Sequence, residues 1–563
     1  MTVSSCVFGL LLFGFSLAYH SIIPFNRGLW PQVVGVLFMV LSFGVVFWFY
    51  LQGRYAQPQS PVRAVMYAHF LLVAVFLAFY FWPALRLMAV WSEEYQWLNI
   101  AKQIVAGDRI HPIAAKTDYP SSYQAFVIAL LLRTGFSPLT ASRIAGFLLY
   151  LAALFFFWQI MLLMSYGRRA ALASLVFPAL SVSAISAFLV GWHEITHVNL
   201  LILGSWYYFL NLVLLRCTQS LIPLGILISL SIWTLYTPAL FAGILMLLLI
   251  FSPSSLLSFK QKATLALVVS ILCAPVLGQL VQTNGGSVIR VYQFYIEGGE
   301  WPNTKFGPDK RPLDAYKQTM RRIAEHLSPS KAVSGIDSLV ALHPEITTLV
   351  FAVLSLVWLG FWWRGRAIIG FYLPAILLLV GVMLSNPTVW RESCLNAVVF
   401  VSAGKGFCQL LEWSCRRYGR FFCTGLALLI LIGHVYLFIP KYHQALKVLP
   451  SLCPTGRLAE TLYSEIVPRL GESEQIVLTD DLTAQMLASL LPRGVTPHFC
   501  FDLDECMSET SREESIVVFT SPPKPAQSLG EILGQIEAVG LERSIRVLYG
   551  SQGEPEALFI MEH

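Results

Sequence analysis

The sequence predicts a mainly α-helical, polytopic membrane protein with about 13 transmembrane helices and a small C-terminal α/β domain on the extracytoplasmic side. Of the 563 residues, 56% are hydrophobic and 12% are charged, and the mean hydropathy is +0.65. This composition excludes an ordinary soluble globular protein. Apolar runs of about 20 residues, long enough to cross a bilayer as a helix, recur up to about residue 440. The segment 441–563 instead alternates short strand-like and helix-like stretches.

The apolar runs place the membrane spans. We expect spans at residues 5–24, 29–51, 64–83, 138–166, 169–190, 195–215, 220–236, 238–252, 264–282, 346–363, 367–385, 392–411 and 419–439. The first run lacks a preceding lysine or arginine and a small-residue cleavage site, so it reads as a retained helix rather than a signal peptide.

The distribution of basic residues supports this order of spans. With the N-terminus in the cytoplasm, the short outer loops carry only Arg27 and Arg391. The short inner loops carry Arg54, Arg63, Arg168, Arg169, Arg216, Lys260, Lys262, Arg364, Arg366, Arg416, Arg417 and Arg420. Because Lys and Arg collect on the cytoplasmic side, the spans obey the positive-inside rule. Three long segments then lie outside the cytoplasm: residues 84–137, residues 283–345 and the tail from residue 441.

The sequence therefore divides into a transmembrane part, 1–440, and an outer domain, 441–563. In the tail, "EQIVLTDD", "ESIVVFTSPP", "SIRVLYG" and "EALFIME" predict strands, and "TAQMLASLLP" and "LGEILGQIEAVG" predict amphipathic helices. A disulfide among Cys453, Cys500 and Cys506 is compatible with an oxidising outer compartment. The tail has no Gly-rich phosphate fingerprint, so we expect a structural or acceptor-binding role.

Carboxylates are scarce in the first 296 residues, which contain only Glu93, Glu94, Asp108, Asp118 and Glu194. All five fall on the outer side of the predicted topology. Asp108 and Asp118 fit ordinary solvated loop residues. Glu93 and Glu94 differ, because they lie between an apolar helix and an amphipathic one that we expect to lie on the bilayer surface. Acids at membrane depth usually mark a function.

The stretch "GWHEITHVNLL" contains His193-Glu194-x-x-His197, the pattern of a zinc metallopeptidase helix. Its two histidines share one helical face, and the glutamate between them can activate a metal-bound water. The third ligand motif of a zinc peptidase is absent downstream, and Asn386-Pro387-Thr388 lacks the required Asp. Three interpretations remain: a donor or divalent-metal site of another enzyme, a structural helix end at the interface, or an intramembrane zinc metallopeptidase.

The first outer segment resembles that of the GT-C superfamily of polyprenyl-phosphate-sugar glycosyltransferases, above all the protein O-mannosyltransferases and lipid A aminoarabinose transferases. The matching elements, in order, are Glu93-Glu94, Gly107, Tyr119-Pro120, Ala141-Ser142-Arg143 and Gly167-Arg168-Arg169. They stand at the family's acidic pair, helix-ending glycine, Y-P-P, a-a-R and G-R-R. The motif match covers about residues 64–215, and the remainder agrees only in architecture.

The sequence also departs from the family pattern. The leading Asp is here Glu93, which leaves open whether Glu93 or Glu94 is the functional acid. Ser121 replaces the second proline, and Thr234-Leu235 replaces a Thr-Lys pair, so the usual donor-phosphate lysine is missing. Another cation would have to contact the phosphate, with Arg391, Lys305, Lys310 and Arg311 as the candidates. The W-W-D signature of oligosaccharyltransferases is absent, since Trp362-Trp363 is followed by Arg364.

The resemblance implies an enzyme that moves a sugar from a polyprenyl-phosphate carrier to a lipid, glycan or protein acceptor, with inversion. Glu93 or Glu94 would be the catalytic base, because a partly desolvated carboxylate can deprotonate an acceptor hydroxyl or amine. Tyr119, Arg143 and the candidate cations would bind the donor, and His193, Glu194 and His197 would hold a divalent metal if one is used. A transporter is disfavoured, because the charges are interfacial.

The charge and glycosylation signals indicate where the protein works. The net charge of +6 fits cytoplasmic loops rather than nucleic-acid binding. No N-x-S/T acceptor with a permitted middle residue occurs. We therefore expect a bacterial inner membrane protein with its active site on the periplasmic face.

Overall fold

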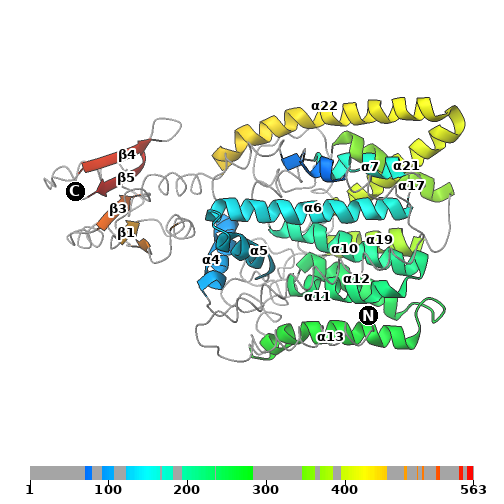
Figure 1. Cartoon of the computed structure of the whole chain (residues 1–563), viewed down its shortest axis with the longest axis horizontal. Coiled ribbons are helices and arrows are strands. Elements are labelled where there is room, and N and C mark those ends of the chain that lie inside the picture. Colours follow the sequence, from blue (N-terminus) through cyan, green and yellow to red (C-terminus); the bar gives the residue numbers. More distant parts are fainter. Residues whose placement is uncertain are drawn as a thin grey trace, which may run out of the picture.

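The computed structural model describes residues 70–75, 77–78, 92–106, 122–164, 168–181, 193–234, 236–282, 345–361, 368–384, 395–452 and 491, and five strands between residues 475 and 561. It shows a bundle of roughly parallel and antiparallel helices, with a small sheet beyond one end of the bundle (Figure 1). The helices are α4 (Ser92–Ala106), α5 (Ser122–Arg133), α6 (Pro138–Met164), α7 (Arg168–Ala173), α8 (Val176–Ala179), α10 (His193–Leu215), η1 (Thr218–Ser220), α11 (Leu221–Thr234), α12 (Tyr236–Ile250), α13 (Phe259–Gln282), α17 (Ile346–Phe361), the π-helical η3 (Ile368–Tyr372), α19 (Leu373–Leu384), α21 (Leu395–Tyr418) and α22 (Arg420–Leu452).

From residue 138 onward, every predicted span coincides with helix in the described part of the chain. The agreement follows from the length of the apolar runs, which specifies one bilayer-spanning helix each. Residues 70–75, in the third predicted span, are helical, while the first two spans lie outside the described residues. The count of about 13 spans therefore stays a prediction.

Within the described part of the predicted span 169–190, the helix is interrupted. Helix α7 ends at Ala173 and α8 begins at Val176. The cause is Pro178, which has no N–H to donate to the carbonyl four residues earlier and whose ring clashes with that carbonyl. That residue is Ser174, which lies in the break.

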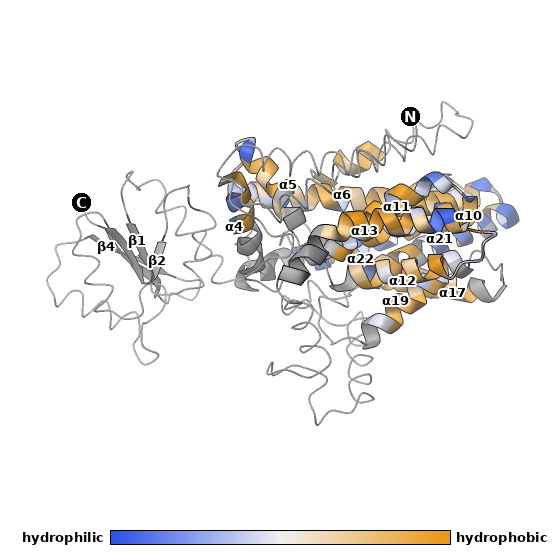
Figure 2. Cartoon of the chain, turned by 90° about the horizontal axis from the view of Figure 1, so that it is seen from below, coloured by the Kyte–Doolittle hydropathy of each residue, from blue (hydrophilic) through white to orange (hydrophobic). Residues whose placement is uncertain are grey.

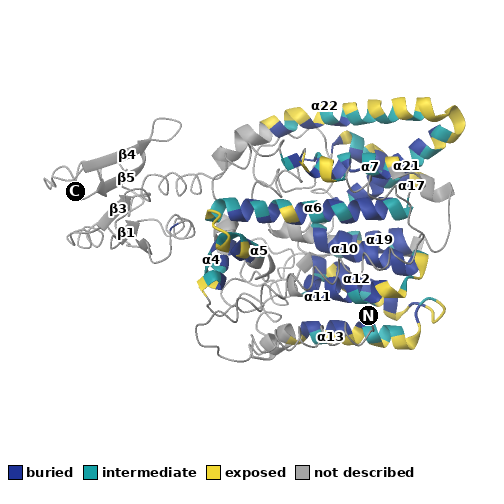
Figure 3. Cartoon of the chain, viewed as in Figure 1, coloured by how far each residue is buried: buried dark blue, intermediate teal, exposed yellow. Residues whose placement is uncertain are grey.

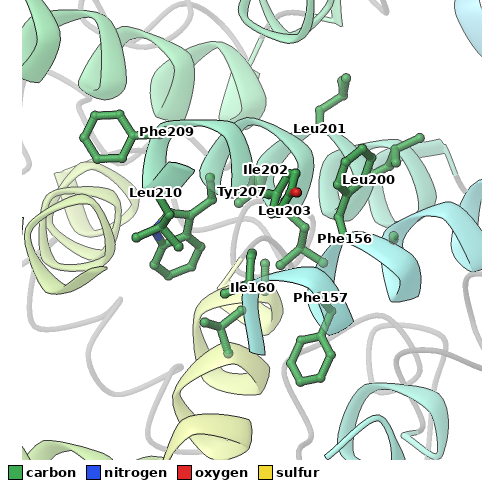
Figure 4. Close-up of a cluster of buried hydrophobic side chains, with 14 of the residues drawn as sticks. Phe156, Phe157, Ile160, Leu200, Leu201, Ile202, Leu203, Tyr207, Phe209 and Leu210 are labelled. Atoms are coloured by element: carbon green, nitrogen blue, oxygen red, sulfur yellow. The ribbon is translucent and has the colours of Figure 1, made fainter. Parts of the chain in front are cut away.

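Helices α6 and α10 form the centre of the bundle. Phe156 of α6 packs against Tyr207 and Tyr208 of α10, with ring centroids 5.8 and 6.0 Å apart. A Cβ on Gly204 would lie 3.3 Å from the Phe156 ring, so the glycine allows the helices to approach closely. Figure 4 shows that α6 and α10 run in the same direction. The labelled side chains pass from Phe156 to Ile160 on α6, and from Leu200 through Leu203 to Tyr207 on α10. Both helices therefore begin at the same end of the bundle.

Helix α22 lies at the edge of the bundle and exposes much of its apolar surface. Its first 24 residues are apolar enough to span a membrane, as is α6, and the other apolar helices that meet this composition test in the described part are shorter. Phe421 is 97% exposed and Tyr436 75%. Figure 2 shows hydrophobic residues dominating the bundle helices, and Figure 3 shows α22 far more exposed than α6. Such an exposed apolar surface is expected where lipid or another protein covers it.

Helix α22 continues past the predicted end of the last span at residue 439 and ends at Leu452. The last predicted span and the first residues of the predicted tail domain are thus one continuous helix. This long helix connects the bundle with the tail.

The tail contains a five-stranded sheet, called here the tail sheet, with the order β2-β1-β3-β5-β4. Strands β2, β1 and β3 are parallel, and β5 pairs antiparallel with both β3 and β4. Four strands coincide with predicted ones, whereas β2 was not predicted from the sequence. The strands are β1 (Gln475–Leu478), β2 (Pro497–Phe499), β3 (Ser515–Phe519), β4 (Ser544–Tyr549) and β5 (Pro555–Met561). The helices expected between them lie outside the described residues, so the α/β class and the boundary at 441 stay predictions.

Candidate active site

Helix α4 carries the acidic pair and packs at the N-terminal end of α6, together with α5 (Figure 1). Trp97, Leu98, Ala101 and Ile104 of α4 are all at most 4% exposed. They contact small residues of the two neighbouring helices, which are Ala125 and Ala129 of α5 and Ala141 and Ala145 of α6. The expectation that this apolar face lies on the bilayer was wrong, because the alanines of α5 and α6 let α4 pack on protein instead.

Glu93 and Glu94 are the second and third residues of α4. A carboxylate in the first turn of a helix is favoured by the helix dipole, so the position is also a good one for structural reasons. The side chains of both glutamates lie outside the described residues. The predicted donor-binding residues Tyr119, Lys305, Lys310, Arg311 and Arg391 also lie outside the described residues.

Arg143 lies near the start of α6 and is only 2% exposed. A buried guanidinium requires hydrogen-bonded or charged partners, because burial of an isolated charge is strongly unfavourable. Its neighbours Ala141 and Ala145 contact the α4–α5 pair, so Arg143 lies at the same level of α6 but on the opposite face of that helix. Tyr150, seven positions further along α6, lies on the same helical face.

The H-E-x-x-H stretch opens α10, with His193 and Glu194 as its first two residues. Gly204 of α10 faces Phe156 of α6, so these two residues lie at the same level of the bundle. Gly204 is 11 residues from the start of α10, and Phe156 is 18 residues from the start of α6. At 1.5 Å per residue, α10 begins about 10 Å deeper in the bundle than α6. Along the bundle axis, the H-E-x-x-H stretch therefore lies between the levels of Arg143 and Tyr150 of α6. The side chains of His193, Glu194 and His197 lie outside the described residues.

Sequence reasoning missed a carboxylate, Glu345, which directly precedes α17 and is fully buried. It interacts electrostatically with Tyr150 of α6. The signal was present in the sequence, because an acid stands directly before an apolar span. The scarcity of acids holds only for the first 296 residues, and Glu345 falls at the end of the predicted outer segment 283–345.

A polar contact next to Glu345 ties together three helices. Thr347 of α17 donates its hydroxyl hydrogen to Nδ1 of His434 of α22, with 2.6 Å between the atoms. The Nε2–H of His434 donates to the carbonyl of Leu180, just after α8, at 2.9 Å. Because a carbonyl can only accept, this pair of bonds assigns the Nε2–H tautomer. Phe177 of α8 packs edge-on against the imidazole, 5.3 Å away.

A metal site stays a prediction. Among the residues with described side chains, no three His, Cys, Asp or Glu residues lie together as metal ligands. The proposed ligands His193, Glu194 and His197 do not belong to that set. Their spacing on the helix α10 does put the two histidines on one face, as a metal site requires.

Comparison with solved structures shows which fold the bundle has. The chain is similar to ArnT from Cupriavidus metallidurans bound to undecaprenyl phosphate, with a TM-score of 0.53 and 13% identity over 89% of this chain and 98% of that chain. It is also similar to the apo state of the same ArnT, with a TM-score of 0.52 and 11% identity over 88% and 98% of the two chains. No family model and no curated protein matches the sequence. The chain therefore has the fold of this ArnT, in agreement with the resemblance of its sequence motifs.

Proposed function

We propose that this chain is an integral-membrane glycosyltransferase that transfers a sugar from a polyprenyl-phosphate carrier to an acceptor on the extracytoplasmic side. The observation that carries this proposal is the fold similarity to an ArnT bound to undecaprenyl phosphate, because it extends over nearly all of both chains. The position of α4 and Arg143 at one end of the bundle supports it further.

The proposed reaction is a single displacement. The carboxylate of Glu93 or Glu94 takes the proton of an acceptor hydroxyl or amine, whose oxygen or nitrogen attacks the anomeric carbon of the sugar. The bond between that carbon and the phosphate oxygen breaks, the configuration inverts, and the polyprenyl phosphate leaves with the bonding electron pair. The second glutamate would orient the acceptor or bind a metal.

Cations near the leaving phosphate would stabilise the negative charge that develops there. Arg143 is one candidate, since it is buried at the end of α6 where α4 packs. Tyr119 and one of Lys305, Lys310, Arg311 and Arg391 would complete the donor site. His193, Glu194 and His197 would form a deeper wall of this site and could bind a divalent metal there. The zinc metallopeptidase alternative gains no support from the fold similarity.

The acceptor is proposed to be a component of the cell envelope, and the compartment the periplasmic face of a bacterial inner membrane. The similarity to an undecaprenyl-phosphate-bound ArnT supports a polyprenyl carrier.

Deletion and complementation test the proposal. Mass spectrometry of envelope lipids and glycans from a deletion strain should show the loss of one sugar-modified species, which the wild-type gene restores. The double substitution Glu93→Gln, Glu94→Gln should fail to restore it, since loss of a general base alone lowers a rate by about 10²–10⁴-fold. Asp108→Asn is the matched control, an acid of the same outer segment that should restore the species. Restoration by the double variant would exclude both glutamates as the base.

A further inference from the structure

A long-range hydrogen bond joins α4 to the tail. The Nζ of Lys102 donates to the backbone carbonyl of Leu491 at 2.7 Å, across 389 positions of the chain. Leu491 itself is 1% exposed. The bond therefore joins α4 to a buried residue of the tail.

The contact buries a charge, which makes it sensitive to the loss of either partner. Burial lowers the pKa of Lys102 from 10.5 to about 8. An ammonium in such surroundings needs hydrogen-bond acceptors to offset the loss of water, and the Leu491 carbonyl is one of them. Removal of the donor would leave a buried carbonyl without this bond, which costs more than the bond itself contributes.

Leu491 belongs to the part of the tail that connects two strands of the tail sheet. It lies between β1 and β2 in the sequence, six residues before Pro497, the first residue of β2. The hydrogen bond from Lys102 therefore joins α4 to the tail itself and not to the end of α22.

Helix α4 is consequently held on two sides. Its apolar face, which includes Trp97 and Ala101, packs on α5 and α6. Lys102 stands at the edge of that face, where the tail reaches it. The same short helix begins with Ser92 followed by the two glutamates. A helix transmits a displacement of its last turns to its first turn, because its backbone is continuously hydrogen-bonded.

We propose that the tail acts as a clamp on α4 through Leu491, with Lys102 as a positioning residue that sets the placement of Glu93 and Glu94 through its bond to the Leu491 carbonyl. The catalytic part of this inference rests on the proposed function. The tail then serves the site through the orientation of α4, and it need not bind the acceptor itself.

The experiment uses the full chain in lipid nanodiscs and compares three substitutions. Lys102→Met removes the donor but keeps most of the alkyl chain, and Lys102→Arg keeps a donor. Gln103→Met places the same new side chain on the neighbouring exposed position of α4. Lys102→Gln, whose amide is too short to reach the carbonyl, is the second loss variant if the methionine variant does not fold.

Hydrogen exchange measured by mass spectrometry tests the clamp without any substrate. In Lys102→Met we expect the amides of α4 and of residues 479–496 to exchange about tenfold faster, the effect of losing one charge-assisted hydrogen bond. Lys102→Arg and Gln103→Met should remain within about twofold of the wild type. Exchange in Lys102→Met equal to that in Gln103→Met would overturn the clamp.

Transfer kinetics test whether the clamp positions the acids. Lys102→Met should lower kcat while the KM for the donor is unchanged, and Lys102→Arg should restore kcat. Faster exchange with an unchanged kcat would overturn the positioning role. Absence of transfer by the wild type would overturn the proposed function, and the exchange experiment would still decide whether the tail holds α4.

Discussion

Helices α6 and α22 are both long, apolar and capable of crossing a bilayer, but they occupy opposite environments. In their most apolar stretches 56% of the α6 residues are buried in the protein, against 11% for α22. The difference does not come from hydrophobicity, since both segments pass the same membrane-span test. It comes from where small residues and polar groups let a neighbouring helix approach.

The two helices are held by different forces. Around α6 the contacts are close and numerous, with Phe157 and Met161 packed against the position of Gly404 on α21. Helix α22 depends on a few specific contacts, of which the His434 pair of hydrogen bonds is the most directional. In lipid, apolar burial supplies little driving force between helices, so packing and such polar contacts decide association.

The largest effect that would sharpen this comparison is expected at Gly406 of α21. A Cβ there would lie 2.0 Å from the backbone carbonyl oxygen of Phe351, and backbone cannot rotate away as a side chain can. Gly406→Ala should therefore separate α17 from α21 and lower the free energy of unfolding by about 3 kcal/mol or more. Thermal unfolding in detergent measures the loss.

Gly433→Ala on α22 is the control for that prediction. No atom lies within 4 Å of the position that its Cβ would take. Since alanine is also the better helix former, the variant should be as stable as the wild type or slightly more stable. Equal losses in the two variants would mean that α22 is packed as tightly as α21 and would break the comparison.

A smaller effect is expected from the substitution that releases α22. His434→Leu removes both hydrogen bonds of the imidazole and leaves the Leu180 carbonyl without its donor. We expect a loss of about 1–2 kcal/mol, because hydrogen bonds between membrane helices contribute less than an isolated bond would suggest. Chemical unfolding of the reconstituted protein measures the loss.

Tyr436→Leu, two positions away on the same helix, is the matched control. This side chain is 75% exposed, so its replacement should change the free energy of unfolding by less than about 0.5 kcal/mol. A loss of equal size in both variants would show that α22 is held by general apolar contact rather than by His434.

Much of the bundle could be predicted from the sequence, because a run of about 20 apolar residues nearly determines a membrane helix. The break before Pro178 could also have been predicted, since proline disrupts the helix four residues earlier. Strand β2 could not, because it is three residues long, starts with Pro497 and lies at the sheet edge, where no alternating pattern marks it. Nor does hydropathy distinguish α6 from α22, because partner contacts, not composition, decide which helix faces lipid.

The candidate site, too, could be predicted from the sequence only in part. Glu93 and Glu94 were placed by their family motif, and the structure adds that α4 packs on α5 and α6 rather than on the bilayer. Lys102 was not a candidate in the sequence, because its contact with Leu491 depends on a segment 389 residues away. His434 gave no sequence signal either, because a single histidine in an apolar helix has no characteristic spacing. Contacts across long stretches of chain need the fold.

The last effect concerns α4, which packs on α5 and α6 with its apolar face and meets the tail at Lys102. Burial lowers the pKa of Lys102 from 10.5 to about 8, so between these values the unfolded chain binds a proton that the folded chain does not. Stability must then rise as the pH increases from about 8 to 10.5, the reverse of a lysine held in an ion pair. The size of the gain is set by the pKa shift, at about 1.4 kcal/mol per pKa unit. Carbon-13 NMR of the dimethylated lysines, with Lys102→Arg to assign the signal, should show a midpoint near pH 8. A midpoint near 10.5 would mean that the tail does not cover this side chain, and α4 would then be exposed on its outer side as α22 is.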